Sequence, residues 1–240
     1  MWTTFSNQQL FLQPNQVHIW SVCKSTHEDR LPIYWELLNV EEQERALKFR
    51  FLKDRYCFII ARGVLRKLLS IYLGMAPAEI KFQFGDNGKP YVNHPSDINF
   101  NISHSGDTIL LGFVQKYSIG VDVEYTKREI DVKRIAQLFF AEEEVASLFA
   151  LDQAYHKQAF YNCWTRKEAF IKAVGSGLSF PLDQFVVSLD STEEATLIDT
   201  KWDKKEKEKW VLNAIEPGKN YIGAVSVKGT VSAIQSWRYQ

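Results

Sequence analysis

Short stretches of alternating apolar and polar residues recur along the chain, and each predicts a β-strand. Residues 16–23 (QVHIWSVC) follow this pattern. Residues 98–114 combine an alternating segment with a continuous apolar run, and a polar turn separates the two. Residues 118–124 (SIGVDVE) have the apolar character of a buried strand. Three more apolar runs predict a β-meander at residues 185–189, 209–215 and 221–227.

The longest helical pattern covers residues 39–74. Asn39 is a suitable N-cap, and acidic residues follow it in the first turn. Gly74 is a natural stop, and we expect a break in the helix near Phe51. The first part of the chain is therefore expected to contain one long helical region before its main strands.

Two further helical patterns lie in the second part of the chain. Residues 132–151 are mostly helical in pattern, and residues 156–177 predict a helix that Gly175 closes. Before them, residues 80–92 (IKFQFGDNGKPYV) predict a strand, a turn at Asn87-Gly88 and a second strand. Helices and strands therefore occur in both parts, which indicates an α+β protein.

One regularity links the two parts of the chain. Residues 40–49 (VEEQERALKF) match residues 140–149 (FAEEEVASLF) at an offset of one hundred, and the same offset aligns Arg66-Lys67 with Arg166-Lys167. Both basic pairs lie in long helical patterns that end in glycine. We therefore expect two similar α+β halves with a ligand in the cleft between them.

The expected halves are residues 1–116 and 117–240, each large enough for a small domain. Lys plus Arg equals Asp plus Glu, at 29 each, so the formal charge is zero. Without a net charge, the protein as a whole does not attract nucleic acid or an anionic membrane, and we expect neither as a partner. The three cysteines match no metal or redox spacing, which indicates a reducing cytosol. Without a leader pattern or an apolar run of membrane-spanning length, we expect a cytoplasmic protein.

Two acidic residues interrupt the predicted strand 118–124. Asp122 and Glu124 are two residues apart, so both side chains point to the same side, where like charges repel. In the last predicted helix, Glu168 and Lys172 are four residues apart and share one face. Three carboxylates that converge without His or Cys suit Mg²⁺. A cation among them would offset the repulsion.

Plainer interpretations of the same residues remain open. The two strand acids could be solvated at a sheet edge, or they could pair with Lys127 and Arg128. Glu168 and Lys172 could form an ordinary pair on a helix surface. Spacing alone does not choose between these alternatives and the metal site.

Other candidates are polar residues beside the predicted strands. Ser103 and His104 lie in the segment NISHSGD, which we expect to enter a turn that can present donors to an anion. His104 is suited to phosphate binding or proton transfer, or it is a structural or exposed residue. The chain has no G-x-S-x-G, Walker or G-x-G-x-x-G motif. Neither a hydrolase triad nor a glycine cradle for a nucleotide is therefore predicted.

Four segments, taken in order, resemble the 4′-phosphopantetheinyl transferases: GKP at 88–90, FNISHSGD at 100–107, IGVDVEY at 119–125 and WTRKEAFIKAVGSGLS at 164–179. The similarity covers about residues 40 to 190. It is greatest to the larger class typified by the surfactin-synthetase activator, as found in cyanobacteria. The pair GVDVE and WTRKEAFIK is the most specific part of the resemblance.

The resemblance implies a fold of two pseudo-symmetric α+β halves with the active site in the cleft between them. Such enzymes move the phosphopantetheine arm of coenzyme A onto a serine of an apo acyl or peptidyl carrier protein and release 3′,5′-ADP. Mg²⁺ is the implied cofactor, with Mn²⁺ as a substitute, and a monomer is the implied state. Carriers of fatty acid, polyketide, nonribosomal peptide or glycolipid synthesis are all open.

The matched motifs imply roles for individual residues. Asp122, Glu124 and Glu168 match the family's metal ligands. Asp122, Glu168 and Lys172 form the implied catalytic set, in which Lys172 matches the lysine at the coenzyme A pyrophosphate. Glu168 is the candidate general base for the carrier serine, either directly or through a metal-bound water.

Other positions match residues at the nucleotide part of coenzyme A. Ser103 and His104 correspond to residues in the 3′-phosphate region, and Lys89 corresponds to the lysine of GKP near the nucleotide. Arg45 and Arg62 fall where the family places basic residues for the phosphates, on a looser alignment.

A docking surface for the carrier protein is expected just beyond the strand that carries the acids. The segment RIAQLFF contains Arg134 and Leu138, followed by two phenylalanines. We expect Phe139, Phe140 or both to contact the carrier. The alternative is that both belong to the core of the second half.

Two other functions stand beside the transferase. One is a Mg²⁺-dependent hydrolase that cuts a pyrophosphate or a nucleotide without a protein acceptor. The other is an α+β binding module in which the acids form a solvated face. Product analysis separates the first from a transferase, and stabilisation by cation plus coenzyme A separates the second.

Overall fold

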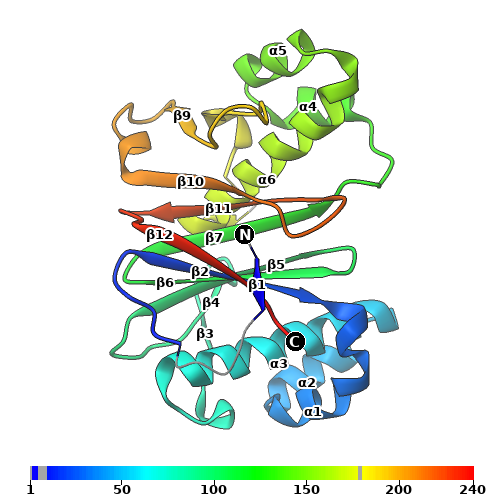
Figure 1. Cartoon of the computed structure of the whole chain (residues 1–240), viewed down its shortest axis with the longest axis vertical. Coiled ribbons are helices and arrows are strands. Elements are labelled where there is room, and N and C mark those ends of the chain that lie inside the picture. Colours follow the sequence, from blue (N-terminus) through cyan, green and yellow to red (C-terminus); the bar gives the residue numbers. More distant parts are fainter. Residues whose placement is uncertain (1, 5–9, 178–179) are drawn as a thin grey trace.

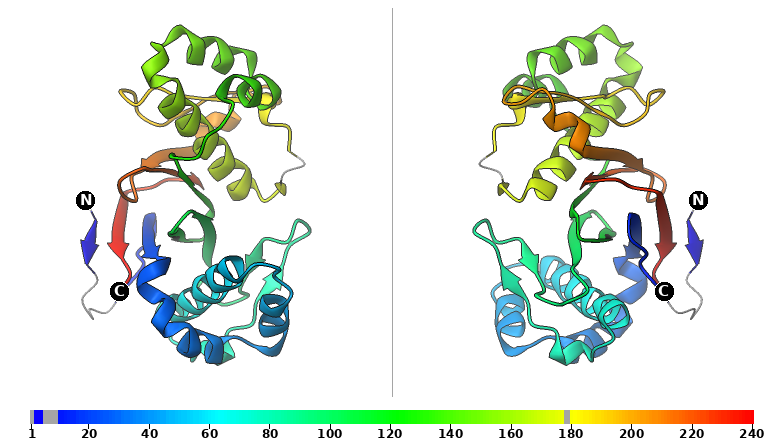
Figure 2. Two further views of the ribbon diagram at one scale, coloured as in Figure 1. Left: turned by 90° about the vertical axis from the view of Figure 1, so that its right-hand side faces the viewer. Right: turned by 90° about the vertical axis from the view of Figure 1, so that its left-hand side faces the viewer.

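Helices form the two outer layers of the molecule, and two β-sheets lie between them (Figure 1). The structure is a computed structural model that describes residues 2–4, 10–177 and 180–240. The layers are also visible in the two turned views of the molecule (Figure 2). This arrangement confirms the predicted α+β fold class.

The first half contributes one helical layer and most of the larger sheet. Its helices are α1 (Leu31–Leu37), α2 (Val40–Leu47) and α3 (Leu52–Leu73). Its strands are β1 (Thr3–Thr4), β2 (Gln16–Cys23), β3 (Gln83–Phe84), β4 (Pro90–Tyr91), β5 (Ile98–Ser105) and β6 (Thr108–Gln115). Within the described residues, the larger sheet has the order β1-β12-β2-β6-β5, in which β12 is Ala233–Arg238.

The second half contributes the other helical layer and the smaller sheet. Its helices are α4 (Val132–Phe139), α5 (Glu142–Ala150) and α6 (His156–Val174). Its strands are β7 (Ser118–Tyr125), β8 (Phe185–Val187), β9 (Leu197–Thr200), β10 (Trp210–Ile215) and β11 (Tyr221–Lys228). The smaller sheet has the order β10-β11-β7, and β8 pairs only with β9 in the part of the chain that the structure describes. The predicted meander is therefore correct for β10 and β11 and wrong for β8.

Several local predictions are confirmed. The Asn39 side chain accepts a hydrogen bond from the Glu42 amide, and the Glu42 carboxylate accepts one from the Asn39 amide, which is a capping box. The expected break near Phe51 separates α2 from α3. Gly74 ends α3 in the left-handed conformation that glycine adopts without strain. Short 3₁₀ helices cover Lys24–Arg30, Pro77–Glu79, Gln153–Tyr155, Leu182–Gln184 and Glu206–Lys209.

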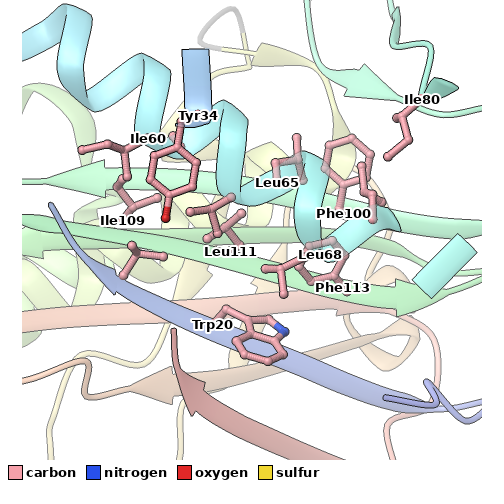
Figure 3. Packing of buried hydrophobic residues seen from close by; sticks show 14 of the residues in the cluster. Trp20, Tyr34, Ile60, Leu65, Leu68, Ile80, Phe100, Ile109, Leu111 and Phe113 are labelled. Atoms are coloured by element: carbon pink, nitrogen blue, oxygen red, sulfur yellow. The ribbon is translucent and has the colours of Figure 1, made fainter. Parts of the chain in front are cut away.

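Apolar side chains fill the space between the layers. Helix α3 packs across the larger sheet, with Leu65 and Leu68 against Phe100, Leu111 and other strand residues (Figure 3). A second cluster joins α6 to the smaller sheet, and a third lies between the two sheets. No helix in the described ranges is both long and apolar enough to cross a bilayer.

The two sheets meet at their edge strands, β5 and β7. The side-chain oxygen of Asn101 on β5 accepts a hydrogen bond from the Val121 amide of β7 at 2.9 Å. Ser105 Oγ accepts one from the Tyr125 amide at 3.0 Å. Two side chains four positions apart on β5 therefore accept hydrogen bonds from backbone amides along the edge of β7.

Helix α6 approaches β7 unusually closely at Gly120. A Cβ atom on Gly120 would lie 2.1 Å from the carbonyl oxygen of Ala169 and 2.4 Å from the amide nitrogen of Ala173. Only glycine fits at this contact. The contact places the acids of β7 beside the polar residues of α6.

Each half contains a buried ion pair of the same design. In the first half, Glu42 at the start of α2 pairs with Arg66 of α3 at 2.9 Å, and Arg66 also donates to the carbonyls of Pro77 and Ile80. In the second half, Glu144 of α5 pairs with Lys167 of α6 at 2.7 Å. Lys167 also donates to the carbonyls of Leu182 and Phe185.

This equivalence refines the predicted internal repeat. The offset of one hundred aligns Arg66 with Arg166. By its contacts, Arg66 corresponds to Lys167, which follows Arg166 directly. The halves are similar, but one residue of slippage separates their long helices.

The chain passes from the larger to the smaller sheet between Gln115 of β6 and Ser118 of β7. It later returns, because β12 pairs in parallel with β2. The larger sheet therefore contains residues from both ends of the described chain (Figure 1).

Candidate active site between the two halves

Three elements bring polar side chains together where the halves meet: β5, β7 and α6. Lys172 Nζ of α6 lies 2.6 Å from Asp122 Oδ1 of β7. Ser103 Oγ of β5 donates to the same oxygen at 2.8 Å, and Lys172 also contacts Ser103 Oγ at 3.1 Å. One carboxylate oxygen thus accepts hydrogen bonds from both halves.

Glu124 has a parallel arrangement two residues further along β7. Ser105 Oγ donates to Glu124 Oε2 at 2.6 Å, and Arg128 lies 3.7 Å from the same oxygen. Burial raises the pKa of Glu124, and the hydrogen bond from Ser105 acts in the opposite direction. Each β7 acid therefore accepts a hydrogen bond from its own serine, and these two serines are two residues apart on β5.

These contacts explain how two like charges are tolerated on one face of β7. The ammonium group of Lys172 offsets the charge of Asp122, and the exposed guanidinium of Arg128 partly offsets that of Glu124. The predicted alternative of pairing with Arg128 is correct for Glu124. Lys172 reaches across to the strand, so it does not form a simple surface pair with Glu168.

Glu168 lies one turn of α6 before Lys172 and is buried, at 8 % exposure. Burial, followed by the nearby charge of Asp122, raises the pKa of Glu168 to about 7. Glu168 Oε1 and Asp122 Oδ2 have no hydrogen-bond partner among the described residues. Two buried carboxylate oxygens at one site are therefore left without a donor, which is costly unless a cation or donor joins them.

The chemistry of these donors fits a hard divalent cation. Asp122, Glu124 and Glu168 supply only carboxylate oxygens, which Mg²⁺ prefers. The described residues contain no cluster of three such side chains already arranged around one point. Asp122 and Glu124 lie close enough to Glu168 to act on its charge, and the predicted role of the three as metal ligands stays a prediction.

Ser103 and His104 are separated by the geometry of the strand. We expected both to lie in a turn, but both belong to β5, and the turn follows at Gly106. Ser103 is buried and contacts Asp122, whereas His104 points to the other side of β5 and is exposed. The structure therefore brings only Ser103 into the carboxylate site.

Lys89 also occupies a position that sequence alone did not indicate. Its Nζ atom donates to the carbonyl of Lys172 at 2.7 Å and to the carbonyl of Ile119 at 2.8 Å. Burial lowers the pKa of Lys89 to about 8. The side chain thus reaches from the first half to the backbone of the second.

Arg45 and Arg62 lie apart from the carboxylates, on α2 and α3. Together with Phe58 and Phe82 they line a cavity of about 170 Å³. Arg62 is buried and forms an ion pair with Glu42 at 3.4 Å, and burial lowers its pKa to about 10. Arg45 is exposed. Their predicted contact with coenzyme A phosphates stays a prediction.

The two phenylalanines of the expected docking segment differ in exposure. Phe139 is 44 % exposed, while Phe140 is 5 % exposed and stacks on Phe160 in the core of the second half. The prediction that Phe140 contacts the carrier is therefore wrong, and the alternative that it belongs to the core is correct for this residue. Leu138 is 65 % exposed beside Phe139.

Sequence reasoning missed the role of Ser105. The signal was present, because NISHS and DVE repeat the same spacing of two residues. Two strands that run side by side present such positions to each other, so Ser103 faces Asp122 and Ser105 faces Glu124. The missing information was that β5 and β7 are neighbours.

Comparisons with known proteins identify the family of the chain. Residues 118–226 match the family model of the 4′-phosphopantetheinyl transferase superfamily. Residues 23–115 match a model described as 4′-phosphopantetheinyl transferase, N-terminal. The two models together span both halves and every residue of the carboxylate site.

Individual relatives align over much of the chain. The 4′-phosphopantetheinyl transferase HetI of Nostoc sp. is 32 % identical over 96 % of this chain and 95 % of its own. The 4′-phosphopantetheinyl transferase Sfp of Bacillus subtilis is 32 % identical over 68 % of this chain and 72 % of its own. Among solved structures, the holo-[acyl-carrier-protein] synthase of Thermotoga maritima covers 47 % of this chain and 63 % of its own, with a TM-score of 0.39 and 19 % identity.

The family models and the named relatives thus place this chain among the transferases of the phosphopantetheinyl class. The chain belongs to the 4′-phosphopantetheinyl transferase family, in its larger form with two halves on one chain. The family resemblance predicted from four short motifs is therefore confirmed.

Proposed function

We propose that this enzyme transfers the 4′-phosphopantetheine arm of coenzyme A to a serine of apo acyl or peptidyl carrier proteins and releases 3′,5′-ADP, with Mg²⁺ as cofactor. The main supporting observation is the group formed by Asp122, Lys172 and Glu168 at the junction of the halves. It combines a cation, a carboxylate already held in place and a carboxylate without a partner. These are the groups that phosphoryl transfer to a hydroxyl requires.

Lys172 is suited to neutralise charge on the pyrophosphate. Its ammonium group is partly exposed, at 29 %, and it carries three donors, of which two contact Asp122 and Ser103. Mg²⁺ held by Asp122, Glu124 and Glu168 would supply further charge neutralisation at the pyrophosphate oxygens. Negative charge that repels the incoming hydroxyl is thereby reduced, and the leaving 3′,5′-ADP is stabilised.

Glu168 is suited to accept the proton of the carrier serine. A general base works best when its pKa lies near the working pH. Burial raises the pKa of Glu168 to about 7, and Mg²⁺ held beside the carboxylate would lower that pKa again. In the proposed reaction, the serine oxygen bonds to the β-phosphorus of coenzyme A, and the bond between that phosphorus and the bridging oxygen breaks. The proton passes to Glu168, and the electron pair leaves with 3′,5′-ADP.

We propose that the carrier docks beside helix α4. Phe139 and Leu138 form an exposed apolar pair, and Lys133 and Arg134 on the same helix are exposed cations. Carrier proteins are acidic, so basic and apolar side chains side by side suit them. Because one chain carries both halves of the site, we expect the active enzyme to be a monomer. We also expect it to be located in the cytoplasm.

Intact-protein mass spectrometry tests the proposed function. An apo acyl carrier protein is incubated with the enzyme, coenzyme A and Mg²⁺, and the expected result is a mass gain of one phosphopantetheine group. Asp122→Ala should abolish the gain, and Glu129→Ala, an exposed acid just beyond the strand, is the matched control. Addition of EDTA should stop the reaction, and excess Mg²⁺ should restore it.

Each other outcome has a defined meaning. A gain with Asp122→Ala would keep the transferase and remove Asp122 from its role. Consumption of coenzyme A without a heavier carrier would identify a hydrolase. If several carriers gain nothing and coenzyme A stays intact, the proposed function is wrong.

A further inference from the structure

The tip of the β3–β4 hairpin in the first half contacts the end of helix α6 in the second half (Figure 2). Lys89 Nζ donates to the carbonyl of Lys172 at 2.7 Å, and Asn87 Nδ2 donates to the carbonyl of Gly175 at 2.9 Å. Gly88 has a positive φ of 75°, which allows the tight turn between these two side chains. We call this contact, made by Asn87 and Lys89, the hairpin clasp.

The hairpin clasp supplies hydrogen-bond donors to carbonyl groups at the C-terminal end of helix α6. The last carbonyl groups of an α-helix have no partner within the helix, and this end carries a partial negative charge. An ammonium group from another element satisfies both needs. The C-terminal end of α6 is thus held partly by residues of the opposite half.

Lys89 also bonds to the strand that carries the acids. Its second hydrogen bond goes to the carbonyl of Ile119, three residues before Asp122 on β7. The first goes to the carbonyl of Lys172, whose side chain contacts Asp122. One ammonium group therefore links the backbone of Lys172 to the strand that carries Asp122.

These contacts differ from those expected of a residue that binds a ligand. Two of the three donors of Lys89 are directed at backbone carbonyls, and the side chain is largely withdrawn from solvent. Lys172 also has two occupied donors, but they contact side chains of the carboxylate site, whereas the donors of Lys89 bond to main-chain carbonyls of β7 and α6. The geometry of Lys89 fits the fixing of backbone better than the binding of a nucleotide.

We propose that Lys89 is a positioning residue: it reaches across the junction from the first half and sets the distance between Lys172 and Asp122 within the second half, and Asn87 supports the same contact. The proposal rests on the proposed transferase function. A displacement of about 1 Å between reacting groups can lower the rate about a hundredfold. Loss of a contact to the backbone of Lys172 itself should therefore have a measurable effect on the rate. The expected consequence of its loss is slower turnover with coenzyme A still bound.

Kinetics of Lys89→Met test this role. We expect kcat to fall about 10-fold to 100-fold while the KM for coenzyme A changes less than about twofold. Asn87→Ala should act in the same direction with a smaller effect, and it serves if Lys89→Met folds poorly. Lys81→Met, an exposed lysine just before the hairpin, is the matched control and should leave both constants unchanged.

A double-mutant cycle distinguishes positioning from direct binding. If Lys89 acts through Lys172, adding Lys89→Met to Lys172→Met should reduce kcat by less than about a further twofold. Binding of 3′,5′-ADP by calorimetry should be about equal in wild type and Lys89→Met. Additive losses in the cycle, or a tenfold weaker affinity for 3′,5′-ADP, would overturn the proposal and assign Lys89 to the nucleotide.

Hydrogen exchange separates this inference from the proposed function. The amides at the end of α6 and the start of β7 should exchange faster in Lys89→Met than in wild type or Lys81→Met. Unchanged exchange would mean that the clasp fixes nothing, whatever the activity. A wild-type protein that transfers no phosphopantetheine would refute the function, while faster exchange in the variant would still establish the clasp.

Discussion

Helices α3 and α6 occupy equivalent places in the two halves. They share a buried ion pair, but the polar residues that follow it differ. Both carry a basic residue that pairs with a glutamate whose carboxylate accepts from the N-cap amide of its own helix. Each basic residue also donates to two carbonyls three residues apart: Pro77 and Ile80 for Arg66, Leu182 and Phe185 for Lys167. After Lys167, α6 continues with Glu168 and Lys172, which face the acids of β7. In α3, the equivalent positions hold Lys67, which lies over the ring of Tyr34, and Ile71, which is 45 % exposed.

The strands that precede these helices differ in the same way. Strand β2 presents Trp20 and Val22 to the core around α3, whereas β7 presents Asp122 and Glu124 toward α6. The shared ion pair therefore belongs to the scaffold, and the unshared acids belong to the site. This difference separates residues needed for stability from residues needed for activity.

The largest expected effect concerns the two shared ion pairs. Lys167→Met leaves Glu144 buried without a cation, and we expect a loss of about 3–5 kcal/mol in the free energy of unfolding. Arg66→Met should cost less, because Arg62 remains 3.4 Å from Glu42. Urea unfolding followed by fluorescence measures both. Equal losses would mean that Arg62 does not compensate and that the pairs are equivalent.

The second prediction compares a cation of the site with a cation of the scaffold. Lys172→Met should lower kcat/KM about 10²-fold to 10³-fold, as loss of a group that stabilises charge in the transition state does. Lys67→Met on α3 should leave kcat/KM unchanged, since Lys67 lies over the ring of Tyr34 and away from the acids. Intact-mass assays with an acyl carrier protein provide the rates. A comparable loss in Lys67→Met would show that both halves take part in catalysis.

Two glycines allow a comparison of packing. At Gly120 an added Cβ would meet the Ala169 backbone at 2.1 Å, and at Gly63 it would meet the Tyr34 ring at 2.5 Å. We expect Gly120→Ala to cost about 3 kcal/mol or more and Gly63→Ala about 1–2 kcal/mol, because a ring shifts more easily than a helix backbone. Thermal unfolding tests the order. A larger loss for Gly63→Ala would mean that the helix–helix contact in the first half is tighter than the helix–sheet contact in the second.

The smallest expected effect is a pH dependence that arises in the first half. Burial lowers the pKa of His18 to about 4, below its usual 6.5, so the folded protein binds this proton more weakly than the unfolded chain. The contribution of His18 is fully present above about pH 6.5 and is lost as the pH falls toward about 4, by about 2–3 kcal/mol. Unfolding of wild type and His18→Gln between these values tests this. If both lose stability in parallel, other groups cause the loss.

Much of this arrangement follows from the sequence, for physical reasons that particular residues illustrate. Periodicity gives the face on which a side chain lies, which is why Asp122 and Glu124 could be placed together and Glu168 and Lys172 on one face. Caps and stops such as Asn39 and Gly74 are local, so they were also predicted correctly.

Residues whose roles depend on distant partners could not be predicted in the same way. The contacts of Lys89 with Ile119 and Lys172 span 30 and 83 residues. The burial of Phe140 depends on Phe160, and the orientation of His104 depends on its being in a strand. Composition and spacing do not specify which elements become neighbours.

The return of β12 to the larger sheet has a consequence for folding during synthesis. Strand β2 lies between β6 and β12, so it stays an open edge until residues 233–238 have left the ribosome. Such an edge can pair with other chains, and contacts between distant segments form slowly. The larger sheet of the first half therefore cannot be completed until β12 has been synthesised. Fragments that end before β12 are expected to aggregate.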